Sequence, residues 1–351
     1  MQGSYGFMPG GGIDRLVSGE FSDLFAVGAC GALVVVAEAV TIPLLRRAAI
    51  IDVPGHRSSH TIPTPRGGGL PIAAGLLLAA GLIGGANAAV FAFAVAAFGL
   101  LGFTEDLRGL TAGWRLIMQA MGGTMVAVVL VSGLTGPAAK LVVLVALCAA
   151  WITGFVNAFN FMDGVNGISG AHALIAGVVY AGLGWWRHDG FLVPAGAAVA
   201  VGALAFLPWN AGRARVFLGD AGSYALGAAL AILAADAVLA GIPVEAALGP
   251  LVLYIADTAW TLLRRIRAGE RWLEAHRTHV YQRWCDAGWS HQRVTVTTAA
   301  TTVLLSLLGA ATLAGDPALR AAADLAGAAV VVAYLRSPAL LARRLVRAEA
   351  S

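Results

Sequence analysis

Residues 223–241 read SYALGAALAILAADAVLAG, an apolar run with one charged residue, Asp236. In hydrocarbon, backbone amides and carbonyls must pair within their own segment, so such a run predicts a membrane-spanning helix of about 20 residues. The whole chain has this character: of its 351 residues, 59% are hydrophobic and only 12% are charged, and the mean hydropathy is +0.79. A soluble domain cannot bury so much apolar surface. The composition therefore predicts a polytopic membrane protein and excludes a soluble enzyme and a disordered chain.

Ten further apolar runs resemble this one, and together they predict an all-α transmembrane bundle of 10 or 11 helices. Barrel strands would alternate apolar and polar residues, a pattern that the sequence does not show. The predicted helices cover residues 24–45, 70–86, 88–103, 116–134, 140–157, 170–186, 191–208, 223–241, 244–263, 296–314 and 321–341. We expect a single integral membrane domain, 1–351, with a polar N-terminal segment at 1–23 and a basic tail at 342–351.

The basic residues predict the orientation of the bundle. Only four of them fall on the side of the N-terminus, namely Arg15, Lys140, Arg187 and Arg320. Because short cytoplasmic loops carry an excess of Lys and Arg, we expect the opposite side, with the C-terminus, to be cytoplasmic. The net charge of +4 reflects this asymmetry, and no nucleic-acid partner is expected. The sequence leaves a homodimer open as an alternative to a monomer.

Five loops on the predicted cytoplasmic side contain nearly all the unusual polar residues. They include the stretches TPRGGG (64–69), GFTEDLRGL (102–110), NAFNFMDGVNGISG (157–170), FLGDAGS (217–223) and HRTHVYQ (276–282). A transporter would more naturally place polar groups near the bilayer midplane, in broken helices. The one-sided clustering therefore favours a catalytic surface at the membrane interface.

Three kinds of side chain in these loops suit phosphoryl transfer. Hard oxygen ligands, which Mg²⁺ prefers, are offered by Glu105, Asp106, Asp163 and Asp220. Planar guanidinium donors for phosphate oxygens are Arg213, Arg215 and Arg277. Amides that can recognise a base or a sugar are Asn157, Asn160 and Asn166. Since positioning and charge neutralisation supply most of the catalysis in phosphoryl transfer, we expect a soluble phosphate donor and a lipid-borne acceptor.

The five stretches, in this order, resemble the polyprenyl-phosphate N-acetylhexosamine-1-phosphate transferase family, glycosyltransferase family 4. The resemblance extends over about residues 52–282. It implies transfer of a sugar-1-phosphate from a UDP-N-acetylhexosamine to undecaprenyl phosphate, with release of UMP. It also implies Mg²⁺ as the cofactor, with Mn²⁺ as an alternative, and a place in the lipid bilayer of a bacterial inner membrane with the N-terminus periplasmic.

The resemblance implies roles for individual residues. Asp220 matches the principal metal ligand of the family, and Glu105 and Asp106 match its adjacent acid pair. The further catalytic residues that we expect are Asp163 and His279. Contacts with the substrates are assigned to Arg66, Asn157, Asn160, Asn166, Arg215, His276 and Arg277. Asp257 matches a recurrent acid, whose expected partner is an arginine of the following loop.

The sequence departs from the family pattern at two positions. Glu105 stands where the family usually has Asp, and Asn166 replaces an Asp that is common in several branches. The stretch HRTHVYQ is similar to the branch that initiates O-antigen or other surface polysaccharides. The transferred sugar is either N-acetylglucosamine or a 6-deoxy relative such as N-acetylfucosamine or N-acetylquinovosamine. The HRTHVYQ stretch weakly favours the 6-deoxy sugars. We expect direct attack by the lipid phosphate, with a covalent intermediate as the alternative.

Simpler roles and other functions compete with these assignments. Asp220 could be a helix N-cap and Asp163 a turn residue, while Arg213 and Arg215 could be anchors at the membrane surface. A transporter of nucleotide sugars or lipid-linked sugars, or a catalytically inactive homologue, are the alternative functions. Further candidates for ligand contact are Arg57 and His60. Ionisable residues inside predicted spans that receive no role are Glu38 and Asp236.

Overall fold

The computed structural model describes residues 11–54, 62–271 and 276–349, and within this part it confirms the all-α prediction. Arg57 and His60 lie outside the described residues. The described chain forms thirteen α-helices and two strands of two residues each. Nine of its helices are long and apolar enough to cross a membrane, and a tenth apolar helix, residues 69–83, is shorter.

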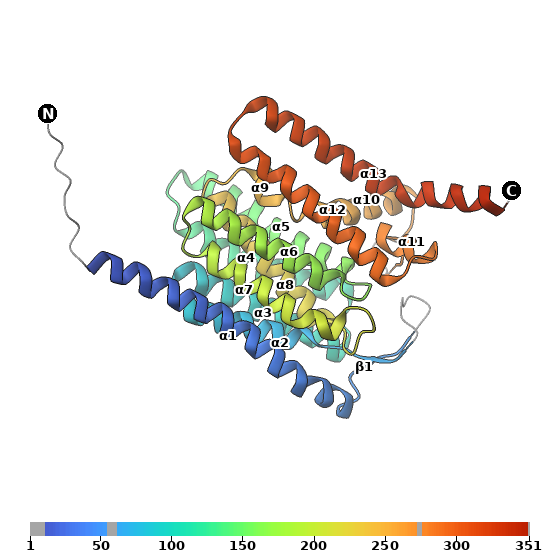
Figure 1. The fold of residues 1–351 in the computed structure, drawn as a ribbon, viewed down its shortest axis with the longest axis horizontal. Helices are drawn as coiled ribbons and strands as arrows, with labels where there is room; N and C mark the ends of the chain where they lie inside the picture. The colour runs from blue at the N-terminus through green and yellow to red at the C-terminus, as the bar shows by residue number, and fades with distance from the viewer. Residues whose placement is uncertain (1–10, 55–61, 272–275, 350–351) are drawn as a thin grey trace.

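The helices pack as one bundle in which α6 lies against α7, α3 against α8, and α1 against both α2 and α7. Their bounds are α1 Gly11–Arg47, α2 Gly69–Ile83, α3 Gly85–Arg108, α4 Ala112–Ser132, α5 Ala138–Met162, α6 Ile168–Arg187, α7 Leu192–Asn210, α8 Gly219–Leu239, α9 Val244–Leu248, α10 Val252–Arg267, α11 Val280–Asp286, α12 His291–Ala311 and α13 Pro317–Glu349, with a 3₁₀ turn at Thr312–Ala314. Figure 1 shows α1 and α13 on opposite flanks, with the two chain ends at opposite ends of the bundle. Every predicted span contains an observed helix.

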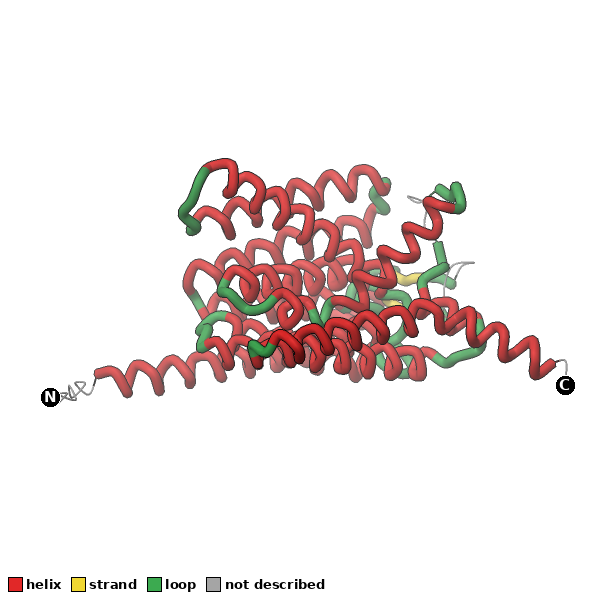
Figure 2. The backbone as a smooth tube through the Cα atoms, turned by 90° about the horizontal axis from the view of Figure 1, so that it is seen from above, coloured by secondary structure: helices red, strands yellow, loops and turns green. Residues whose placement is uncertain are grey.

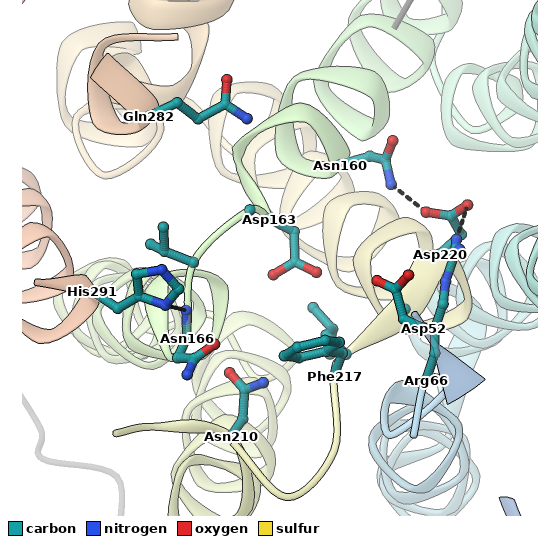
Figure 3. Close-up of a pocket in the computed structure, with 14 residues that line it drawn as sticks. Asp52, Arg66, Asn160, Asp163, Asn166, Asn210, Phe217, Asp220, Gln282 and His291 are labelled. Atoms are coloured by element: carbon teal, nitrogen blue, oxygen red, sulfur yellow. Dashed lines mark hydrogen bonds and ion pairs between the residues drawn. The ribbon is translucent and has the colours of Figure 1, made fainter. Parts of the chain in front are cut away.

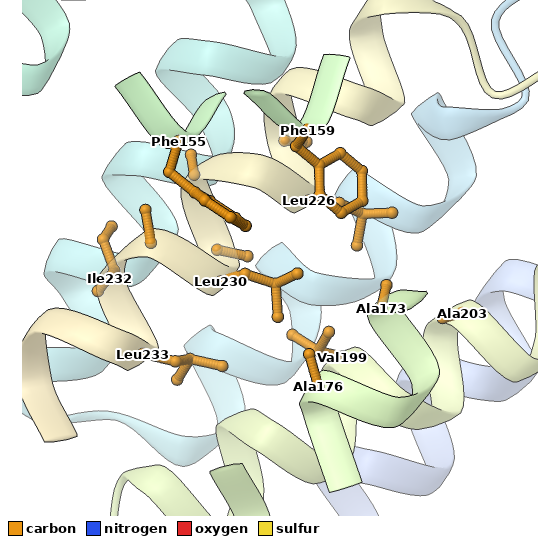
Figure 4. Packing of buried hydrophobic residues seen from close by; sticks show 14 of the residues in the cluster. Phe155, Phe159, Ala173, Ala176, Val199, Ala203, Leu226, Leu230, Ile232 and Leu233 are labelled. Atoms are coloured by element: carbon orange, nitrogen blue, oxygen red, sulfur yellow. The ribbon is translucent and has the colours of Figure 1, made fainter. Parts of the chain in front are cut away.

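Helix α8 forms the centre of the bundle. Its Leu226, Leu230 and Leu233 are fully buried and meet aromatic rings of α5 and small residues of α6 and α7 (Figure 4). Glycines let the neighbouring helices approach closely. A Cβ atom added at Gly69 of α2 would lie 1.9 Å from the Cα of Gly222, and α3 approaches α8 in the same way. This close packing fixes the first turn of α8, which contains Asp220.

The observed helix ends differ from the predicted ones. The predicted helix at 244–263 is broken into α9 and α10, because Pro250 between them has no amide proton to continue the helical ladder. Several polar residues that we expected in loops instead lie in helical turns: Glu105 and Asp106 end α3, Asn157 and Asn160 lie near the end of α5, and Asp220 lies in the first turn of α8. The loop assignment of these residues was wrong, since helical hydrogen bonding continues beyond the apolar run.

Two short strands join the loop after α1 to the segment before α8. Strand β1, Ile51–Asp52, pairs antiparallel with β2, Thr64–Pro65, and Arg66 then forms a parallel bridge with Phe217. Phe217 donates its amide to the carbonyl of Pro65 at 2.8 Å and accepts from Gly67 and Gly68. Both strands lie at one end of the bundle (Figure 2). The pairing brings the TPRGGG stretch against FLGDAGS.

Candidate active site

A polar cavity of about 310 Å³ opens at this end of the bundle. It is lined by the last turn of α5, the first turn of α8, the segment after β2 and the start of α12. Figure 3 shows Asp163 and Asp220 directed into the same space. The structure brings together five of the predicted site residues here: Arg66, Asn160, Asp163, Asn166 and Asp220.

Asp220 is held in place by two side chains from distant parts of the sequence. Its Oδ1 accepts a hydrogen bond from Asn160 at 2.7 Å, and its Oδ2 lies 2.8 Å from Nη2 of Arg66. The Asp220 side chain is 14% exposed and lines the cavity. The N-cap residue of α8 is Leu218, so Asp220 does not cap the helix and its carboxylate is directed to the cavity instead.

Asp106 caps α8 in place of Asp220. Its two carboxylate oxygens accept the backbone amides of Asp220 and Ala221, each at 2.9 Å, where the helix N-terminus favours negative charge. Its Oδ1 also lies 2.5 Å from Nε of Arg66, and its side chain is 1% exposed. Asp106 therefore positions both Arg66 and the main chain of Asp220. A direct catalytic role for Asp106 stays a prediction.

Arg66 bridges the two carboxylates. Burial alone would lower the pKa of Arg66, but the charges of Asp220 and Asp106 outweigh burial and raise that pKa above its ordinary value. The guanidinium is thus a fixed positive charge at the cavity wall, about a third exposed. This geometry suits an anionic ligand that approaches Asp220 from the cavity.

Asp163 follows the end of α5 and is half-buried. Desolvation raises the pKa of Asp163 to about 7; the hydroxyl of Ser169 opposes this shift, and the charge of Asp220 adds to it. The carboxyl group therefore changes its charge near neutral pH unless a cation binds beside it.

The far side of the polar cavity contains amides and several residues to which we had assigned no role. Asn166 donates to the carbonyl of Gly212 at 2.7 Å, which ties the loop after α5 to the loop after α7. Asn210, 5% exposed, accepts the amide of Gly167 at 2.8 Å. The polar lining residues to which we assigned no role are Asp52, Asn210, Gln282 and His291. Asp52 lies at the start of the region of resemblance, residues 52–282, and Gln282 ends the HRTHVYQ stretch, whereas nothing in the sequence around Asn210 and His291 marked them.

An adjoining cavity of about 390 Å³ lies between α4, α5, α10 and residues 276–282. It shares Asn160 and Gln282 with the polar cavity, so the two spaces meet at these side chains. Three further predicted site residues line it: Asn157, His276 and His279. Its apolar walls come from Leu116, Phe161 and Leu262. Asn157 is fixed by Gln119, whose Oε1 accepts its amide at 2.5 Å.

His279 lines this adjoining cavity and is held in place by Asp257. Its Nδ1 lies 3.0 Å from Oδ1 of Asp257, and both side chains are almost fully buried. Asp257 also accepts the hydroxyl of Tyr334 at 2.8 Å, so the arginine that we expected as its partner is replaced by histidine and tyrosine. Among the described residues, Nε2 of His279 has no hydrogen-bond partner. A carboxylate at Nδ1 favours the tautomer that carries a proton on that nitrogen.

Residues 88–238, from α3 to the end of α8, match the model of glycosyl transferase family 4. The match to a glycosyl transferase family 4 domain covers this segment of the chain. The matched segment contains Glu105, Asp163 and Asp220, and the resemblance found in the sequence is confirmed.

Proteins that are similar to this chain extend the match over most of its length. A decaprenyl-phosphate N-acetylglucosaminephosphotransferase of Mycolicibacterium smegmatis is 29% identical over 84% of this chain and 82% of its own length. A probable undecaprenyl-phosphate N-acetylglucosaminyl 1-phosphate transferase of Bacillus subtilis is 28% identical over 71% of this chain and 75% of its own length. A phospho-N-acetylmuramoyl-pentapeptide-transferase of Leuconostoc mesenteroides is 29% identical over 54% of this chain and 66% of its own length.

Several predicted site residues lie away from both cavities. Arg215 stacks on Trp209, 5.6 Å from the ring centre, and lines a separate hollow with Arg46 and Arg213, so the structure does not place it at the site. Arg277 forms an ion pair with Asp286 at 3.1 Å. The reason in both cases is local: each guanidinium is drawn to a partner in its own segment.

Glu105 contributes to the wall of the site rather than to its lining. Its Oε2 accepts the amide of Leu110 at 2.6 Å, and its Oε1 lies 3.3 Å from Nη1 of Arg115, which does line the adjoining cavity. The longer side chain of Glu reaches across the turn after α3 to make both contacts. Its catalytic role stays a prediction.

The oxygen ligands of the polar cavity fit Mg²⁺ better than a metal ion that is held by protein side chains alone. Among the residues that the structure describes, no group of three or more His, Cys, Asp or Glu side chains is arranged to hold an ion. Three carboxylates line the cavity, those of Asp52, Asp163 and Asp220. Mg²⁺ typically takes one or two protein carboxylates and completes its shell with water and substrate phosphates. The cavity therefore fits an ion that arrives with a phosphorylated ligand.

Proposed function

We propose that the chain transfers N-acetylglucosamine-1-phosphate from UDP-N-acetylglucosamine to undecaprenyl phosphate or a close polyprenyl relative, and that it releases UMP. The observation that carries the proposal is the pair of cavities that meet at Asn160 and Gln282. One is polar and opens beyond the helix ends, and the other has apolar walls among helices of the bundle. The names of the mycobacterial and Bacillus relatives support the choice of sugar over its 6-deoxy analogues.

The polar cavity suits the nucleotide sugar. Arg66 offers a fixed guanidinium to a phosphate oxygen, and the amides of Asn166 and Asn210 lie across the cavity, where a base or sugar needs paired donors and acceptors. Asp220 and Asp163 would hold Mg²⁺, which when bound neutralises charge on the diphosphate. A cation there would also keep Asp163 ionised at neutral pH.

The adjoining cavity suits the lipid phosphate. Leu116, Phe161 and Leu262 give the first prenyl units an apolar wall, and His279 lines the same cavity. A phosphate monoester is still partly protonated near pH 7, and the imidazole of His279 can accept its proton. The deprotonated acceptor oxygen then forms a bond to the β-phosphorus of the donor. The bond from that phosphorus to the bridging oxygen breaks, and UMP leaves with the electron pair.

Purified enzyme tests this function. With UDP-N-acetylglucosamine, undecaprenyl phosphate and Mg²⁺ we expect UMP, and none when the lipid is omitted. UDP-N-acetylfucosamine and UDP-N-acetylquinovosamine serve as competing donors. Donor binding without UMP from any of the three sugars, or movement of the UDP-sugar across a membrane without UMP, would contradict the proposal.

The substitution Asp220→Asn tests the site. We expect turnover to fall at least about 100-fold, since the amide removes a carboxylate placed to hold the cation. Asp324→Asn, which changes an exposed carboxylate of α13, is the control and should leave turnover unchanged. Near wild-type activity in Asp220→Asn would show that Asp220 does not belong to the active site.

A further inference from the structure

Another cavity, largely apolar but with two acidic side chains in its lining, lies at the end of the bundle away from the active site. Its volume is about 640 Å³, and α3, α4, α8 and the turn between α6 and α7 line it. Asp236, which lines this distal cavity, is about 24 Å further along α8 than Asp220 at 1.5 Å per residue. The distal cavity is therefore separate from the two cavities described above.

The distal cavity is acidic. Asp236 is 8% exposed; its Oδ1 accepts the amide of Asn87 at 3.0 Å, but its Oδ2 is buried with no hydrogen-bond partner among the described residues. Asp189 lines the same cavity, and its Oδ1 caps α7 through the amide of Leu192 at 2.8 Å. The lining within the described chain contains these two carboxylates and no Lys, Arg or His. Because a buried carboxylate oxygen without a donor is unfavourable, this arrangement favours a ligand with a cationic N–H group.

A positive charge lies at the rim of the distal cavity. Nε of Arg187 donates to the carbonyl of Ala240 at 3.0 Å, and Ala240 is one of the lining residues. The Arg187 side chain is exposed. The surface thus presents two negative groups within the cavity and one positive group at its edge. This pattern is complementary to a zwitterion whose cationic group enters first and whose phosphate stays outside.

An apolar groove continues from the distal cavity along the lipid-facing side of α3 and α4. It has a volume of about 870 Å³ and shares Phe93 and Val129 with the cavity. Along α4 it extends from Val129 to Ile117, roughly 18 Å by helical rise, which is close to the depth of one leaflet's hydrocarbon. Met121 and Met125 in the groove are more than half exposed, and such flexible side chains adapt to acyl chains.

We propose that the distal cavity and the α3–α4 groove together bind a phospholipid with a primary ammonium head group, that is, phosphatidylethanolamine. The ammonium donates to Oδ2 of Asp236 and to Asp189, and the phosphate lies beside Arg187. The acyl chains follow the groove towards the bilayer midplane. A phosphatidylcholine head group carries the same charges but has no N–H to donate, and an anionic head group is repelled by the two carboxylates.

Lipid retention in native mass spectrometry tests the proposal. The detergent-purified full chain is titrated with phosphatidylethanolamine, phosphatidylcholine and phosphatidylglycerol of identical acyl chains. We expect the wild type to hold the ethanolamine lipid about tenfold more tightly than the choline lipid, as one charge-assisted hydrogen bond allows. Equal retention of these two lipids, or preference for phosphatidylglycerol, would overturn the proposal.

Variants localise the effect. Asp236→Asn should reduce the preference to near one, whereas Asp324→Asn, a carboxylate outside the cavity, should preserve it. Arg187→Gln changes an exposed side chain and should weaken retention of the ethanolamine lipid without affecting folding. The elution volume and melting temperature in detergent show whether each variant is folded. If Asp236→Asn does not fold, Arg187→Gln decides, and unchanged retention in that variant contradicts the proposal.

Discussion

At the scale of single residues, the site depends on carboxylates that hold other groups in place. Asp106 does not line the polar cavity, yet it contacts Arg66 and the backbone of Asp220. Asp257 holds His279 in the same manner, at the wall of the adjoining cavity. The residue types were predictable from the sequence, whereas these pairings join segments more than 100 and more than 20 positions apart and depend on helix packing.

We expect Asp106→Asn to lower the rate of UMP release about 100-fold, with a smaller change in the KM for the donor. The amide carries no charge to hold Arg66, and it can accept fewer of the three N–H groups that now share the carboxylate. Breaking a buried ion pair on one side destabilises by roughly 3 kcal/mol or more, so the melting temperature should also fall. Unchanged kinetics would show that Asp106 does not position Asp220.

Asp163 gives the stability of the cation-free protein a pH dependence. Its pKa is about 7 in the folded protein, against about 3.9 in an unfolded chain, so the folded state holds the proton more tightly. Between about pH 4 and pH 7 its contribution to stability is lost as pH rises. The variant Asp163→Asn lacks this titrating carboxyl group, so its stability lacks this contribution to the pH dependence.

With a chelator present, the melting temperature of wild type should fall relative to that of Asp163→Asn as pH rises from about 5 to about 8. Saturating Mg²⁺ should reduce the difference, because the cation replaces the proton. If the melting temperatures of the two proteins changed with pH by the same amount over this range, Asp163 would not be desolvated.

At the scale of helices, the sequence predicted the number and order of the spans but not their ends. An apolar run marks the part of a helix that lies in hydrocarbon, and helical turns continue beyond it. For this reason Glu105, Asn160 and Asp220 lie on helices rather than in loops. Helical placement fixes their direction more firmly than a loop would, and this accounts for the short contacts around Asp220.

The close approach of α2 and α8 makes Gly69→Ala a sharp test of packing. The added Cβ would lie 1.9 Å from the Cα of Gly222, so the two helices must separate. We expect a loss of about 1–3 kcal/mol in unfolding free energy, and lower activity because Asp220 moves with α8.

Gly81→Ala, in the same helix, is the matched control. A Cβ atom there meets nothing within 4 Å, so this variant should be as stable as the wild type or slightly more stable. Thermal unfolding in detergent measures both. Equal melting temperatures for the two variants would contradict the packing described for α8.

At the scale of the whole molecule, the bundle gathers segments from its full length at one end. Arg66 comes from the loop after α1, Asp220 from α8 and His279 from the segment before α11. The common face of these motifs was predicted from the sequence. Their division between two cavities was not, and neither was the exclusion of Arg215 and Arg277, because local partners decide where a flexible guanidinium lies.

We propose that donor and acceptor occupy separate, adjoining cavities. Leu262→Trp tests it most directly, because Leu262 lines only the cavity assigned to the lipid phosphate. Leu263→Trp, the next residue of α10, is 42% exposed and outside both cavities, and it serves as the control. The KM for each substrate is measured by UMP release. We expect the KM for undecaprenyl phosphate to rise at least about tenfold in Leu262→Trp alone, with the KM for the UDP-sugar unchanged. An equal rise in both KM values, or the same effect from Leu263→Trp, would contradict the account.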